Sequence, residues 1–422
     1  MSTDRIGRET HNFEGWQRRV ALFLSSQSLS LFGSALVQYA IIWHITLTTQ
    51  SGAMLTIATL AAFLPQIVIS LFAGVWADRY PRKMLIMASD ALTAVSTLIL
   101  GVFFALGYQE LWLIFVVVGI RSVGAGIQLP AVNAFLPEIV PQDKLIRVNS
   151  LNGTLQPIFM IAAPVIAAAM LSVTSLQNIF FVDVVTATLA IALLAVLRTP
   201  VRQLTPAQQA TSYLDDLRAG LNYVGQSSTL KTLFVFYGFI FFLIAPVVFL
   251  TPLHVAREFG EEIWKLTANE VTWFAGSIIG GFLMTAWGGF KSHFRTLGLA
   301  SMVWAVLFVG LGLSNVFVLY LVFMFLAGFP MPVWHAASTT LLQEIVEPHM
   351  HGRVFGFQQI LSTAIMPLGM AFFGPIADVV SIELLLVVSS ALLAVPGAWI
   401  FFNRGLQQPQ PALAPVEQDL FD

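Results

Sequence analysis

The feature that most constrains the fold of this chain is a series of long apolar segments separated by short polar loops. A helix needs about 20 consecutive apolar residues to cross a lipid bilayer, and twelve segments of that kind can be marked along the sequence. Because 57% of the residues are apolar and only 10% are charged, the composition is that of a membrane protein. The sequence therefore predicts an all-α integral membrane protein with twelve transmembrane helices, at residues 18–46, 52–77, 82–106, 109–136, 145–172, 176–198, 228–253, 264–289, 294–314, 317–342, 351–380 and 382–403.

The longest polar connection between these segments separates the sixth from the seventh and divides the chain into halves. We therefore expect an N-terminal six-helix half at residues 1–198, a cytoplasmic linker at 199–228 and a C-terminal six-helix half at 229–404. Residues 405–422 are rich in Pro and Gln and end in acidic residues, which predicts a disordered tail.

The distribution of Lys and Arg predicts the orientation in the membrane. If both termini are cytoplasmic, almost all of the 20 Lys and Arg residues fall in cytoplasmic loops or at cytoplasmic ends of segments. Only Arg257 and Lys265 then lie outside, and Arg121 lies within the membrane. Because cytoplasmic loops carry the excess of Lys and Arg, we expect both termini in the cytoplasm.

A weak internal repeat agrees with the division into halves. Glu138-Ile139-Val140, followed by Arg147, recurs as Glu344-Ile345-Val346, followed by Arg353, at an offset of 206 residues. Each copy connects the fourth and fifth segments of its half. Two six-helix halves related by a parallel repeat are typical of transporters whose substrate site lies between the halves.

The loop after the second segment carries a charged pattern that resembles a known signature. Residues 74–83 contain Asp78 and Arg79, then Arg82 and Lys83, and this order is similar to the loop signature between helices 2 and 3 of major facilitator superfamily transporters. Pro81 stands where members of that superfamily usually have Gly. Its fixed φ suits the first turn of the next helix.

Further phrases carry the same resemblance along the whole chain. They are Asp90, Arg121-Ser122-Val123-Gly124, Pro130-Ala131-Val132-Asn133-Ala134 and Gly352-Arg353-Val354-Phe355-Gly356. Residues 162–168 resemble the antiporter signature of helix 5, with Ala in place of each Gly. The chain resembles the drug-efflux members of the superfamily, in particular the macrolide-efflux and enterobactin-export group. From the resemblance, the internal repeat and the charges within the membrane together, we expect coupling and gating roles for Asp78, Arg79, Arg82, Lys83, Asp90, Arg121, Asp183, Glu138, Arg147, Glu344 and Arg353.

Three charged residues inside predicted membrane segments are candidates for coupling, namely Arg121, Asp90 and Asp183. Arg121 lies near the middle of its segment, where an arginine costs about 2.5–3.5 kcal/mol, so it needs a partner or a water-filled cavity. Asp90, at a comparable depth, is the partner we expect; alternatively, Asp90 anchors the neighbouring loop through Arg82. Asp183 is either an isolated carboxyl that carries a proton or a structural cap. Arg121 itself either responds to a protonatable group or forms a static ion pair.

Polar side chains recur at helical spacing on several segments, as on the face that includes Gln27, Ser34 and Gln38. They either line a water-filled cavity or hold neighbouring helices together by hydrogen bonds. We expect a substrate cavity lined by Gln27, Ser34, Gln38, Gln66, Gln128, Asn152, Gln156, His335, Gln358 and Ser362.

These observations predict a secondary active exporter of amphipathic organic molecules, drug-like compounds or a siderophore, in the cell (inner) membrane. No nucleotide-binding loop of the Walker type is present in the sequence. We therefore expect no cofactor, and we expect an ion gradient of H⁺ to drive export by antiport. The alternatives on the same fold are a lipid or lysolipid transporter and a small-solute importer. The alternative from a different class of protein is a membrane enzyme. No cysteine, metal-ligand spacing or nucleophile signature is present, and no basic tract points to nucleic acid. The expected partners are the substrate and the lipid bilayer, and we expect a monomer.

Overall fold

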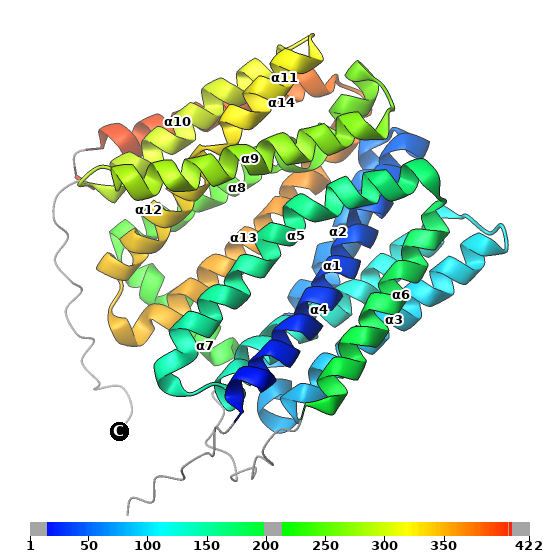
Figure 1. Ribbon diagram of the computed structural model, residues 1–422. Coiled ribbons are helices and arrows are strands. Elements are labelled where there is room, and N and C mark those ends of the chain that lie inside the picture. The colour runs from blue at the N-terminus through cyan, green and yellow to red at the C-terminus, as the bar shows by residue number, and fades with distance from the viewer. Residues whose placement is uncertain (1–14, 198–212, 404, 407–422) are drawn as a thin grey trace, which may run out of the picture.

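The computed structural model describes residues 15–197, 213–403 and 405–406, and the described part of the chain is helical throughout (Figure 1). The helices of the first part are α1 (Trp16–Thr49), α2 (Gly52–Arg79), α3 (Arg82–Ala105), α4 (Leu111–Ile139), η1 (Gln142–Lys144), α5 (Leu145–Val173) and α6 (Leu176–Val196). The second part contains α7 (Tyr213–Gln226), α8 (Ser228–His254), η2 (Val255–Phe259), α9 (Ile263–Trp287), α10 (His293–Gly312), α11 (Phe317–Gly328), α12 (Pro330–Ile345), η3 (Pro348–Met350), α13 (His351–Ile376) and α14 (Ile382–Phe402).

Ten helices in the described residues are long and apolar enough to cross a membrane. Residues Phe317–Ile345, which contain α11 and α12, form one of these spans. The helices α5 and α9 occupy the other two segments expected from the sequence, and residues Ile161–Val173 of α5 form a shorter apolar helix. The prediction of an all-helical, multi-pass membrane protein is confirmed.

The long helices pack in two groups that follow the order of the chain (Figure 1). In the first group, α1 packs against α5 and α6, while α3 packs against α4 and α6 and α2 packs against α4. In the second group, α8 packs against α13 and α14, α10 against α12 and α14, and α9 against α11. The groups meet where α2 contacts α13 and α5 contacts α9. The exact domain boundaries expected from the sequence stay predictions.

Two ends of the helix bundle are used as reference points below. The Gln50 end contains the turns between α1 and α2 and between α13 and α14, and the Arg82 end contains the turn between α2 and α3 (Figure 1). Asp78 occupies the last turn of α2, but its side chain lies outside the described residues, as does the side chain of Gln156.

Small residues after Arg121 allow α4 to approach two neighbouring helices closely. A Cβ atom added at Gly124 would lie 2.8 Å from the Thr93 hydroxyl of α3, and one at Gly126 would lie 2.9 Å from the Gln66 carbonyl of α2. Helix interfaces in membranes use small residues in this way because close backbones gain van der Waals contact. The pattern 121–126 therefore fixes α4 between α2 and α3.

Two segments differ from the helices expected from the sequence. The expected single segment at residues 317–342 is divided into α11 and α12 at Phe329, because Pro330 has no amide hydrogen to continue the helical pattern. The expected linker at 199–228 contains α7, which buries Tyr223 and Val224 and packs against α13. Residues 199–212 and 407–422, which hold the rest of the expected linker and nearly all of the expected disordered tail, lie outside the described residues.

Candidate functional site

A buried ion pair lies between α4 and α6 in the first group of helices. The Arg121 guanidinium donates to the Asp183 carboxylate and to the Thr97 hydroxyl, and its second amino group lies 3.5 Å from the Ser34 carbonyl. The Asp183 side chain is 1% exposed and that of Arg121 is 12% exposed. Both charges are therefore withdrawn from water and neutralise each other.

Asp90 lies in the same region but has different partners. Its Oδ1 atom accepts hydrogen bonds from the Ser30 hydroxyl at 2.6 Å and from the Gln128 amide at 2.9 Å. Its Oδ2 atom is buried and has no hydrogen-bond partner among the described residues. Both acids lie beside α1, since Ser30 donates to Asp90 and a Cβ atom added at Gly33 would lie 2.8 Å from the Asp183 carboxylate. The acid without a basic partner in this cluster is therefore Asp90.

The predicted pairing of Arg121 with Asp90 is wrong, because the partner of Arg121 is Asp183. The expectation that Asp183 is an isolated carboxyl is wrong for the same reason. Residue counting gives the depth of a side chain along its helix but not the direction in which it points. The packing of α6 against α1 and α3 decides that direction and brings Asp183 to Arg121.

The charged residues at the Arg82 end connect four helices. Arg82 donates to the Ala77 carbonyl at 3.0 Å and the Ala134 carbonyl at 2.6 Å, and it pairs with Glu138 at 3.1 Å. Lys83 donates to two carbonyls at the end of α6, those of Ala195 and Leu197, at 2.8 Å each. A cation at this position suits the negative end of a helix dipole. Arg79 is exposed.

The repeated Glu-Ile-Val pattern forms comparable contacts in the second group. Glu344, at the end of α12, lies 3.2 Å from His293 at the start of α10, as Glu138 at the end of α4 lies near Arg82 at the start of α3. Arg353 contacts the Met350 sulfur at 3.6 Å, whereas Arg147 is exposed. The sequence repeat is therefore also a repeat of side-chain contacts at one end of each group.

The polar residues expected to line a cavity have varied positions. Gln27 is buried, with 3% exposure, while Gln38 and His335 are exposed. Gln358 donates to Ser338 at 2.9 Å, and Ser338 donates to the Tyr237 hydroxyl at 2.5 Å, so these three residues connect α13, α12 and α8. The remaining residues of the set are partly buried: Ser34, Gln66, Gln128, Asn152 and Ser362.

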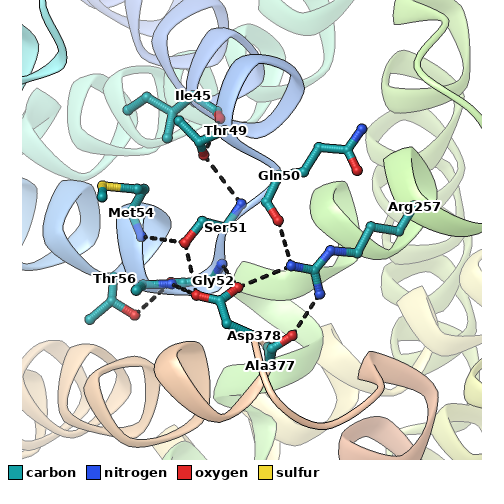
Figure 2. A network of polar contacts seen from close by, with 11 residues as sticks. Ile45, Thr49, Gln50, Ser51, Gly52, Met54, Thr56, Arg257, Ala377 and Asp378 are labelled. Carbon is teal, nitrogen blue, oxygen red and sulfur yellow. Dashed lines mark hydrogen bonds and ion pairs between the residues drawn. The ribbon is translucent and has the colours of Figure 1, made fainter.

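A polar network that the sequence did not predict joins the two groups of helices at the Gln50 end (Figure 2). Asp378, in the turn after α13, accepts from the backbone amides of Gly52 at 2.7 Å and Ala53 at 2.9 Å, and from the Ser51 hydroxyl at 2.8 Å. These amides belong to the first turn of α2, whose free N–H groups and helix dipole attract a carboxylate. An acid of the second group thus caps a helix of the first.

Arg257 of η2 completes this network, which we call the Asp378 network. Arg257 lies 3.0 Å from Asp378 and donates to the carbonyls of Ala377, at 2.6 Å, and of Gln50. Burial raises the pKa of Asp378, but the bonds from Ala53, Gly52, Ser51 and Arg257 outweigh it and hold that pKa below its ordinary value. The carboxylate is therefore ionised at neutral pH. The available signal in the sequence was an acid inside a predicted apolar segment.

Among the described residues, no group of three or more His, Asp and Glu side chains is placed to hold a metal ion. The site as described consists of buried charges and the hydrogen bonds that they form.

A bundle of apolar helices in two groups, with paired charges between its helices, is the architecture of a membrane transporter. The sequence pattern of the Major Facilitator Superfamily matches residues 20–370. Macrolide efflux protein A of Streptococcus pyogenes is 28% identical over 390 residues, which cover 90% of this chain and 95% of that protein. The multidrug efflux pump Tap of Mycolicibacterium fortuitum is 23% identical over 91% of this chain and 95% of its own length.

The fold has a close counterpart among solved structures. A bacterial homologue of the human lysosomal transporter Spinster, in an inward-facing and unoccupied conformation, aligns with a TM-score of 0.71 at 14% identity, covering 94% of this chain and all of that one. The chain therefore belongs to the Major Facilitator Superfamily, and it is a transporter and not an enzyme.

Proposed function

We propose that this chain exports amphipathic organic molecules across the cell (inner) membrane by alternating access, driven by proton antiport. Similarity over nearly the whole length to a macrolide efflux protein carries the proposal. In this proposal twelve helices cross the membrane, with α11 and α12 forming one span, and both termini are cytoplasmic. The Gln50 end then faces outward and the Arg82 end faces the cytoplasm. The scarcity of charge in the predicted cavity favours weakly charged or apolar organic molecules over strongly ionic ones.

The Asp378 network supports an outer gate. It joins α2 of the first group to α13 and η2 of the second, so it must break if the groups separate at this end. The side chains of Arg257 and Asp378 are 29% and 28% exposed. A partly exposed pair stabilises by about 0–1 kcal/mol, and each bond to a charged group adds about 1.5–3 kcal/mol. Such a joint is strong enough to favour one state and weak enough to open.

Asp90 supports a proton site. Asp183 is neutralised by Arg121, whereas Asp90 has only neutral hydrogen-bond donors and one carboxylate oxygen without a partner. A buried carboxylate in those surroundings gains more from taking up a proton than one already paired with arginine. Export by antiport requires an acid that binds a proton in one state and releases it in the other. We assign that role to Asp90, with Arg121 and Asp183 as its electrostatic neighbours.

The experiment that tests export uses inverted membrane vesicles containing the full chain. An imposed proton gradient, acidic inside, should drive uptake of a macrolide or another lipophilic compound from a broad panel, and an uncoupler should abolish that uptake. Uptake of lysolipid alone would favour the lipid transporter, and movement in the opposite direction would favour the importer. Either result, or no gradient-dependent uptake of any compound, would contradict the proposal. Glu110→Gln, an exposed acid at the start of α4, is the matched control.

A further inference from the structure

The middle of α2 departs from the regular hydrogen-bond pattern of a helix. Pro65 lies inside α2 and has no amide hydrogen, so the carbonyl of Ala61, four residues earlier, lacks its usual helical partner. The next amide, that of Gln66, donates to the Ser122 hydroxyl of α4 at 2.9 Å, and this hydroxyl donates to the Ala62 carbonyl at 2.6 Å. In a regular α-helix the Gln66 amide and the Ala62 carbonyl bond each other. A side chain of α4 therefore takes part in the backbone pattern of α2.

The face of α4 that carries Ser122 has small residues where it lies against this turn of α2. Gly119 and Gly126 stand about one turn before and one turn after Ser122. A Cβ atom added at Gly126 would lie 2.9 Å from the Gln66 carbonyl, and one added at Gly119 would lie 4.0 Å from the Ala61 carbonyl. Ser122 itself is buried, with 5% exposure. The close approach of the two helices thus brings the hydroxyl to the backbone of α2 and keeps water away from it.

Ser122 directly follows Arg121, and the two side chains hold α4 to different helices. Arg121 binds Asp183 of α6 and Thr97 of α3, whereas Ser122 binds the backbone of α2. Consecutive residues of a helix point in different directions, so one turn of α4 can contact all three neighbours. This turn therefore links the buried ion pair to the irregular turn of α2.

The irregular turn divides α2 into two parts with separate contacts. The part before Pro65, about 20 Å long at a rise of about 1.5 Å per residue, begins with the amides that bind Asp378. The part after Pro65 ends at Arg79, next to the turn that precedes α3. Helices bend at proline and where a side chain enters the hydrogen-bond ladder, and α2 has both features within one turn. A change of angle in this turn would move the first turn of α2 relative to Asp378.

We propose that the Ser122 hydroxyl controls a hinge in the middle of α2. While it bridges the Gln66 amide and the Ala62 carbonyl, α2 keeps the angle that brings its first turn to Asp378. Without the hydroxyl these two backbone groups bond each other, the turn becomes more regular, and the part of α2 before Pro65 moves away from Asp378. Ser122 is thus a positioning residue that acts through α2. This inference rests on the proposed function, to which it adds the point about which α2 moves when the outer gate opens.

The test measures the position of each part of α2 by distances between spin labels in the purified full-length chain. One pair of labels reports on the first part of α2 at the Gln50 end, and a second pair reports on the last turn of α2 at the Arg82 end. The labels are attached to cysteines that replace exposed residues. The first pair is Ile57→Cys with Leu106→Cys, and the second pair is Tyr80→Cys with Val196→Cys.

Ser122→Ala should shift the first distance by about 3 Å or more and leave the second unchanged, because only the part of α2 before the hinge moves. Pro65→Ala returns an amide to the same turn and should shift the first distance in the same direction. Ser122→Thr keeps a hydroxyl and should keep the original distance. Gradient-driven uptake should fall at least fivefold in Ser122→Ala, while ligand affinity in detergent stays within about twofold. Ser301→Ala is the control, since Ser301 is also buried but donates to the Leu297 carbonyl of its own helix at 2.9 Å.

The hinge is contradicted if Ser122→Ala leaves the first distance unchanged, or if Ser122→Ala and Pro65→Ala shift it in opposite directions. A shift of both label pairs would show a general loosening of the first group and would also contradict the hinge. Pro65→Ala tests the hinge from the other helix, so the result does not depend on how one substitution packs in α4. The label distances need neither a substrate nor a gradient, so failure of the hinge is distinguishable from failure of gradient-driven export.

Discussion

At the scale of single residues, the buried charges of the first helix group divide into a closed pair and an open acid. Arg121 and Asp183 neutralise each other between α4 and α6, and the hydroxyl of Thr97 adds a hydrogen bond to the pair. Asp90 retains an oxygen without a partner among the described residues. The first arrangement favours stability and the second favours a change of protonation.

Removing one member of the closed pair should destabilise the protein strongly. Asp183→Asn leaves the Arg121 charge buried without its counter-ion, and the expected loss is about 3–5 kcal/mol. The double variant Arg121→Gln/Asp183→Asn should be more stable than either single variant, because no unpaired charge remains. Thermal unfolding in detergent measures both effects. Asp143→Asn, in an exposed pair with Lys144, should change stability by less than about 1 kcal/mol, and additive losses in the double variant would contradict the pairing.

Asp90, the open acid, should govern the coupling of uptake to the proton gradient rather than the binding of the ligand. Asp90→Asn keeps an oxygen that can accept the Ser30 and Gln128 hydrogen bonds but removes the group that takes up a proton. We expect gradient-driven uptake in inverted vesicles to fall at least tenfold, while ligand affinity in detergent stays within about twofold. Uptake with an unchanged dependence on the gradient would place the proton site elsewhere.

At the scale of helices, the informative contact is the cap that one group supplies to the other. The free amides at the start of α2 are satisfied by Asp378 from the turn after α13, and Arg257 of η2 holds the same carboxylate. Because Asp378 and α2 belong to different groups, the stability of the first turn of α2 depends on the relative position of the two groups.

Neutralising this cap should open the Gln50 end. Asp378→Asn removes the charge that binds α2 and Arg257, so spin labels on Leu106→Cys and Leu313→Cys, both exposed, should report a longer distance population. Because the pKa of Asp378 lies below its ordinary value of 3.8, the stabilisation is present at neutral pH and is lost as pH falls below about 4. When Asp378 is unchanged, the distance between the labels at positions 106 and 313 should therefore stay the same from pH 8 to pH 5. An Asp378→Asn distance equal to that of Glu110→Gln would exclude a gate here.

At the scale of the whole molecule, the testable property is the orientation in the membrane. The natural sequence contains no cysteine, so single cysteines can be placed at will. Cysteines replacing the exposed residues Glu110 or Leu313 should react with an impermeant maleimide in intact cells. Cysteines replacing the exposed residues Gln142 or Lys291 should react only after the membrane is opened. The reverse pattern would invert the outer and inner ends assigned to the Asp378 network and the Arg82 cluster.

The sequence by itself determined the helical, membrane-spanning character of the chain and the approximate helix positions. Both depend on apolar length, a property that can be read along the chain. It also determined that Arg121 needs a partner, because a charge in lipid is costly until some neighbour neutralises it. The structure shows which helices approach the small residues Gly124 and Gly126 closely.

Only the tertiary structure decided which charges meet. Asp183 rather than Asp90 pairs with Arg121, and Asp378 caps α2 from the other group. Position along the chain gives the depth of each residue, whereas the partner depends on the rotation of each helix about its axis and on which helices are neighbours. Those quantities come from packing over the whole bundle, where residues hundreds of positions apart in sequence come into contact.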